Sequence, residues 1–178
     1  MQQTTFVIGG CRSGKSGHAL KLAESYDLNQ RVYIATCVPQ DEEMRYRVAR
    51  HQAERGNRWS TVEEPLQLPE VIESNCSPDT VLLVDCLTLW VTNMIMANDK
   101  RDPEQLLVPT QRLVRSLANA TGPVVLVSNE VGTGIVPENR LARLFRDAAG
   151  SVNQSVAAAV DIVFWMVAGL PMKVKPLH

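Results

Sequence analysis

Residues 9–16 read Gly9-Gly10-Cys11-Arg12-Ser13-Gly14-Lys15-Ser16, which is a complete G-x-x-x-x-G-K-[ST] motif. Its glycines let the backbone turn tightly and bring backbone N–H groups close to phosphate oxygens. Its lysine can place a positive charge on the outer phosphates of a nucleotide, and its serine hydroxyl can bind Mg²⁺. The motif therefore predicts a phosphate-binding loop, or P-loop, with a nucleoside triphosphate as its ligand.

The segments on either side of the motif support this interpretation. Residues 4–8 are β-branched or aromatic, which is typical of a buried strand. After the loop, Ala19, Leu20, Leu22 and Ala23 fall at helical spacing, and the N-terminus of such a helix would point at the same anion. The alternative is a glycine-rich turn with a chance Lys-Ser pair, and such a turn would not require this order of strand, loop and helix.

The composition indicates a single globular domain that spans residues 1–178. Hydrophobic residues make up 45% and charged residues 21% of the chain, as in an ordinary soluble protein. The net charge of −1 does not favour nucleic acid as a partner. The longest apolar stretches, near residues 81–97 and 156–169, are interrupted by polar residues, so no membrane span is expected.

The four cysteines bear on metal binding and on the compartment. They form no C-x-x-C pair and do not cluster with the three histidines, so no zinc site is predicted. The N-terminus has no signal peptide. Because reduced thiols are the rule in the cytosol, a cytoplasmic protein is expected.

Apolar strands alternate with helices along the rest of the chain. Strands are predicted at residues 31–35, 59–63, 80–85, 123–128 and 161–167, with a small edge strand at 172–175. Helices are predicted at residues 41–55, 87–98, 103–119 and 138–160, with one short helix within 65–76. This pattern is typical of a parallel sheet with helices on both faces. Ligands of such sheets bind beyond the carboxyl ends of the strands, where Thr36, Asp85, Asn129 and Glu130 join the P-loop.

Asp85 follows the strongest predicted strand. In P-loop proteins an acidic residue at this position holds Mg²⁺, directly or through water. A second possible role is that of an N-cap, because a helix is predicted from Leu87 onward. The two roles are compatible.

Three further residues have two possible roles each. His51 lies in an arginine-rich helix and could attack phosphorus as a neutral imidazole, or could be a solvated surface residue. His18 could face the nucleotide or pack against the sheet, and we expect packing. Glu63 ends a strand and could accept hydrogen bonds from a guanine edge or a ribose, or could simply be exposed. The polar loop at residues 128–137 follows a buried strand and is expected at the active site.

Together these segments resemble the family of bifunctional adenosylcobinamide kinases / adenosylcobinamide-phosphate guanylyltransferases of cobalamin biosynthesis. The resemblance spans nearly the whole chain and is carried by residues 9–16, 33–36, 47–55, 85–93 and, most specifically, 129–143. It implies a RecA-like P-loop fold and a homotrimer. It also implies two reactions. A nucleoside triphosphate, ATP or GTP, first phosphorylates the aminopropanol hydroxyl of adenosylcobinamide, and GTP then transfers GMP to that phosphate.

The resemblance also implies roles for individual residues. His51 would carry GMP as a covalent intermediate, Lys15 would be catalytic, and Ser16 and Asp85 would hold Mg²⁺. The implied nucleotide contacts are Gly9, Gly10, Cys11, Arg12, Ser13, Gly14, Lys15, Ser16, Ile34, Ala35, Thr36, Gln52, Ala53, Glu54, Arg55, Glu63 and Asp85.

Two other functions remain open at the level of sequence. A P-loop kinase for a small molecule, without guanylyltransferase activity, would transfer phosphate. The protein itself would not become covalently labelled when incubated with labelled GTP. A GTP-binding regulatory module would bind the nucleotide without releasing pyrophosphate.

Overall fold

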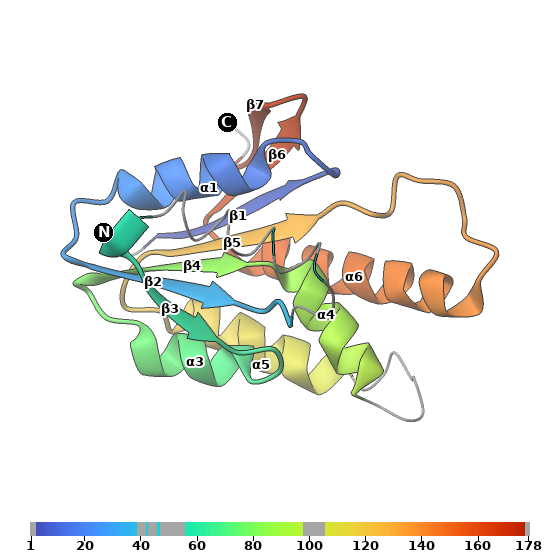
Figure 1. Cartoon of the computed structure of the whole chain (residues 1–178), viewed down its shortest axis with the longest axis horizontal. Helices are drawn as coiled ribbons and strands as arrows, with labels where there is room; N and C mark the ends of the chain where they lie inside the picture. Colours follow the sequence, from blue (N-terminus) through green and yellow to red (C-terminus); the bar gives the residue numbers. More distant parts are fainter. Residues whose placement is uncertain (1–2, 39–41, 43–45, 47–55, 98–105, 177–178) are drawn as a thin grey trace.

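The computed structural model of the chain describes residues 3–38, 42, 46, 56–97 and 106–176. Seven strands form one sheet in the order β3-β2-β4-β5-β1-β6-β7 (Figure 1). The strands are β1 (Thr4–Gly9), β2 (Gln30–Ala35), β3 (Ser60–Glu63), β4 (Thr80–Asp85), β5 (Val124–Asn129), β6 (Ile162–Val167) and β7 (Leu170–Lys175). Every neighbouring pair is parallel except β6 and β7, which are antiparallel.

The helices are α1 (Lys15–Glu24), α3 (Leu68–Asn75), α4 (Leu87–Met96), α5 (Leu107–Ala118) and α6 (Arg140–Ala159), with a short 3-10 helix at Gly56–Arg58. The predicted strands and helices are confirmed within the described residues, with ends that shift by a few positions. For example, α6 begins at Arg140 because the Asn139 side chain accepts a hydrogen bond from the Ala142 N–H at 3.1 Å and caps the helix. Apart from Glu42 and Tyr46, which are helical, the helix predicted at residues 41–55 lies outside the described residues. The first residues of the helix predicted at 103–119 also lie outside them.

Both faces of the sheet are buried. Alternate residues of one strand, such as Phe6 and Val7 of β1, belong to two different apolar clusters because successive side chains of a strand point to opposite faces. One cluster includes side chains of α3, α4, α5 and α6, and the other includes side chains of α1 with Trp59. Figure 1 shows α1 on one face of the sheet and α3, α4, α5 and α6 on the opposite face. Covering on both faces explains why the central strands are continuous apolar runs. Among the described helices, none has the length and apolar character needed to cross a membrane.

Candidate active site

The P-loop connects β1 to α1 and has a compact geometry. The Lys15 side chain folds back, and its ammonium donates a hydrogen bond to the Gly10 carbonyl at 3.0 Å. Gly14 has φ +88°, a conformation that side chains strongly disfavour. At Gly9, a Cβ atom would lie 2.6 Å from Ser13 Oγ and 2.8 Å from the Met166 carbonyl oxygen, so only glycine fits. The φ angle at Gly14 and the close contacts at Gly9 explain why two of the three glycine positions of the motif require glycine.

The P-loop packs against the turn that joins β6 to β7. The Gly169 N–H donates a hydrogen bond to the Ser13 carbonyl at 3.1 Å. Ala168 and Gly169 have φ values of 51° and 85°, so both central residues of this two-residue turn are left-handed, as in type I′ hairpins. The β6–β7 hairpin therefore packs against the P-loop and supports it.

The carboxyl ends of the central strands form one continuous edge beside the P-loop. In the sheet register, Ala35 lies opposite Glu63 on one side and Asp85 on the other. Thr36 is fully buried, and its hydroxyl donates to the Cys86 carbonyl at 2.8 Å and accepts from the Cys86 N–H at 3.0 Å. The structure thus brings Ile34, Ala35, Thr36, Glu63 and Asp85 to one edge, as the sequence predicts. Glu63 is exposed there.

Asp85 and Lys15 both act electrostatically on Cys86. Burial raises the pKa of the Cys86 thiol to about 12, the Asp85 charge adds to the rise, and the Lys15 charge opposes it. Cys86 therefore stays a neutral thiol at physiological pH. The two charges that act on it belong to the two residues for which roles at the phosphates are predicted. Asp85 is not the N-cap of α4, because the cap residue is Cys86.

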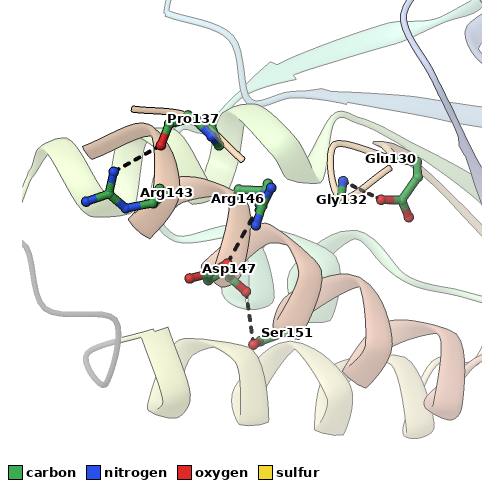
Figure 2. Close-up of polar contacts among 7 residues, drawn as sticks. All are labelled: Glu130, Gly132, Pro137, Arg143, Arg146, Asp147 and Ser151. Atoms are coloured by element: carbon green, nitrogen blue, oxygen red, sulfur yellow. Dashed lines mark hydrogen bonds and ion pairs between the residues drawn. The ribbon is translucent and has the colours of Figure 1, made fainter. Parts of the chain in front are cut away.

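The loop between β5 and α6 is fixed at both ends (Figure 2). At its start, the Glu130 N–H donates to the Gly9 carbonyl at 3.0 Å, which ties the loop to the P-loop. The Glu130 carboxylate accepts from the Gly132 N–H at 2.6 Å. At its end, the Arg143 guanidinium donates to the Pro137 and Glu138 carbonyls at 3.0 and 2.6 Å. The expected position of this loop beside the P-loop is confirmed.

His18 packs against the sheet, as expected. Its ring contacts Phe164 edge to face, with the ring centres 5.0 Å apart. Burial lowers the pKa of the imidazole, and the nearby Lys21 charge lowers it further. His51 and the contacts predicted at Gln52, Ala53, Glu54 and Arg55 lie outside the described residues, so the predictions for them stay predictions.

The donors at the sheet edge suit Mg²⁺. Ser16 and Asp85 offer hydroxyl and carboxylate oxygens, the hard ligands that this ion prefers. The described residues contain no group of three or more His, Cys, Asp or Glu side chains that could hold a metal without other ligands. Mg²⁺ usually binds through one or two protein oxygens together with substrate phosphates and water, so this sparse donor set fits it.

Comparison with known proteins identifies the family. The model of the family described as "Cobinamide kinase / cobinamide phosphate guanyltransferase" matches residues 5–174. The chain belongs to this family. A bifunctional adenosylcobalamin biosynthesis protein, CobU, of Salmonella typhimurium is 44% identical over 179 residues, which cover 95% of this chain and 98% of the relative. The CobP protein of Pseudomonas aeruginosa, which has the same bifunctional description, is 43% identical over 169 residues, or 95% of each chain.

The cobinamide kinase / guanyltransferase chain shares its fold with solved structures of a recombinase and an ATPase domain. The RadB recombinase superposes with a TM-score of 0.53 at 15% identity, over 92% of this chain and 73% of that one. A second solved structure, of an ATPase domain, gives 0.52 at 14% identity, over 92% and 69% of the two chains. At such low identity the likeness concerns the fold alone. It confirms the predicted fold class.

Sequence reasoning missed two features of this family member's site. The first is the β6–β7 turn on the P-loop, for which the only local signal was Gly169 after an apolar strand. The second is the Glu130 side chain, which sequence places at the right edge without indicating its contact to Gly132.

Proposed function

We propose that the protein phosphorylates the aminopropanol hydroxyl of adenosylcobinamide with ATP or GTP. It then transfers GMP from GTP to the new phosphate, which gives adenosylcobinamide-GDP and pyrophosphate. The observation that carries the proposal is the sheet edge, where a complete P-loop lies beside a row of predicted guanosine and metal contacts in a chain of this family. One domain, residues 1–178, would carry out both steps.

The first step needs positioning and charge neutralisation more than covalent chemistry. Lys15 would bind the outer phosphates, and the P-loop amides would hold the phosphate chain. Ser16 and Asp85 would hold Mg²⁺, which when bound neutralises charge on the phosphates of the donor. Lys15 follows β1 and Asp85 ends β4, with only β5 between these two strands, which supports their joint action at one phosphate group.

The second step needs attack at the α-phosphorus of GTP. An imidazole nitrogen of His51 would form a bond to that phosphorus while the bond to the pyrophosphate oxygen breaks. A phosphate oxygen of adenosylcobinamide phosphate would then attack the same phosphorus and release the histidine. Ile34, Ala35, Thr36, Glu63 and the stretch Gln52, Ala53, Glu54 and Arg55 would bind the guanosine. The buried anchoring of Thr36 supports a rigid contact there.

Labelling by GTP tests the ligand, the reaction and the residue together. After incubation with Mg²⁺ and GTP labelled at the α-phosphate, we expect the wild-type protein to carry acid-labile, base-stable label. His51→Ala should carry none. His18→Gln is the matched control, because His18 packs on Phe164, and it should label like the wild type.

Equal labelling of wild type and His51→Ala would refute the covalent role. Phosphoryl transfer to cobinamide without any protein label would favour a kinase that lacks the second activity. GTP binding without pyrophosphate release would favour a regulatory module. We also propose that the protein is a homotrimer, as the family resemblance implies, and that it is cytoplasmic, in line with cysteines that are thiols rather than disulfides.

A further inference from the structure

A cavity of about 340 Å³ opens on the β6 side of the P-loop, away from the predicted guanosine contacts Ile34 and Glu63. Its walls are residues 10–13 of the P-loop, Glu130 and Thr133 of the β5–α6 loop, and residues 165–168 at the end of β6. In the sheet order, β5 and β6 flank β1, whereas Ile34, Glu63 and Asp85 lie on β2, β3 and β4. A second ligand can therefore approach the P-loop from the β6 side.

The chemistry of the cavity is amphipathic. One wall is apolar, with Trp165 and Val167 each 41% exposed at the end of β6. The charged side chains in the lining are Arg12 and Glu130. The apolar wall and the Glu130 carboxylate suit an alcohol on a larger, partly apolar carrier, and the Arg12 guanidinium can bind a phosphate that lies beside it.

Glu130 is held firmly at this position. Its N–H donates to Gly9, and the preceding residue, Asn129, donates its N–H to Thr88 Oγ1 at 2.7 Å and accepts at its carbonyl from Asn153 at 3.2 Å. One carboxylate oxygen accepts from Gly132, as Figure 2 shows. Within the described part of the chain, the other oxygen makes no hydrogen bond, so it remains available to a ligand.

The cavity adjoins the end of the P-loop that holds the outermost phosphate. The Lys15 ammonium lies on Gly10, in the same half of the loop that lines the cavity. Because the lysine of this motif reaches the β- and γ-phosphates, the group to be transferred lies at this end. The nucleoside extends from the opposite end of the phosphate chain.

We propose that this cavity binds the acceptor of the kinase step and that Glu130 is its general base. The assignment rests on the proposed function. The acceptor hydroxyl donates its proton to the free carboxylate oxygen of Glu130 while its oxygen bonds to the γ-phosphorus. The bond from that phosphorus to the bridging oxygen breaks, and the nucleoside diphosphate leaves with the electron pair. Glu130 then returns the proton to water.

The first test compares Glu130→Gln with Glu138→Gln. Glutamine at position 130 keeps an oxygen for the Gly132 N–H but removes the base, and Glu138 is an exposed carboxylate in the same loop outside the cavity. We expect Glu130→Gln to lower kcat/KM for adenosylcobinamide by about 100-fold or more and to flatten the acid limb of its pH profile. Labelling by GTP should stay within twofold of wild type, and Glu138→Gln should match wild type in every assay.

Two outcomes would overturn the assignment. One is a kinase rate for Glu130→Gln within threefold of wild type. The other is an unchanged kcat with a raised KM for the nucleoside triphosphate, which would mean that the cavity holds the donor's nucleoside.

Equilibrium dialysis with adenosylcobinamide provides a second test that does not require turnover. Trp165→Leu should bind about tenfold more weakly than wild type, because it loses aromatic contact area in the cavity wall. Val174→Ala, on the neighbouring strand β7 outside the cavity, should bind normally. Unchanged binding by Trp165→Leu would refute the cavity assignment alone. Failure of the wild-type protein to bind or phosphorylate adenosylcobinamide would refute both the assignment and the proposed function.

Discussion

Gly9 is the residue at which the P-loop has the least room. An alanine Cβ would lie 2.8 Å from a backbone oxygen of Met166 and 2.6 Å from Ser13 Oγ, so strand β6 or the loop must shift. We expect Gly9→Ala to lower the free energy of unfolding by about 1–3 kcal/mol. Gly150→Ala is the control, because that helical glycine has open space around it and should gain about 0.5–1 kcal/mol. Urea unfolding measures the stability of both variants. Equal stability of Gly9→Ala and Gly150→Ala would show that Gly9 is not crowded.

His18 makes stability depend on pH. Its pKa is lowered in the folded protein, so the unfolded chain binds a proton more readily than the folded one. Stability should therefore fall as the pH drops below the ordinary histidine pKa of about 6.5, and the loss should stop growing below the folded pKa. His18→Gln cannot take up this proton. Melting temperatures from pH 7.5 to 5 should decline less steeply for His18→Gln than for wild type, and parallel curves would refute this role.

At the scale of elements, α4 connects two of the strand ends that form the site. The Asn93 side chain donates to the Thr36 carbonyl at 2.7 Å and to the Pro65 carbonyl at 3.2 Å, so it holds the segments that follow β2 and β3. Asn93→Ala should cost about 1–3 kcal/mol of stability and should weaken GTP binding, because Thr36 is a proposed contact. Asn119→Ala, at the exposed end of α5, is the control. Calorimetric titration with GTP measures the affinity. Unchanged affinity would show that Thr36 does not contact the nucleotide.

A helix or strand could be predicted from sequence where the residues of that segment alone indicate it. Strands β1, β4 and β5 are continuous apolar runs because both of their faces are covered, and their carboxyl ends place Asp85 and Glu130 correctly. Strand β7 gives a weak signal because most of its residues are exposed. The contact between Gly169 and Ser13 joins distant parts of the chain, so no local pattern encodes it. The cavity depends on three separate segments and could be found only in the folded structure.

At the scale of the whole molecule, we expect association into a trimer. Strand β7 forms an edge of the sheet, and it exposes Leu170, Met172 and Val174. An apolar edge of this kind favours association, because a monomer would leave it in water. One chain has a mass of 19.7 kDa, so three copies give about 59 kDa. Sedimentation equilibrium at micromolar concentration measures this mass, and a value near that of one chain would refute the trimer.

The hydrogen bond between Gly169 and Ser13 joins segments that are synthesised at different times. The P-loop leaves the ribosome early, whereas the β6–β7 turn follows only after β2 to β5 and α6 have been made. A nascent chain therefore contains every residue of the phosphate motif long before the loop has its support. We therefore expect the P-loop to reach its final form only after the last hairpin docks on it.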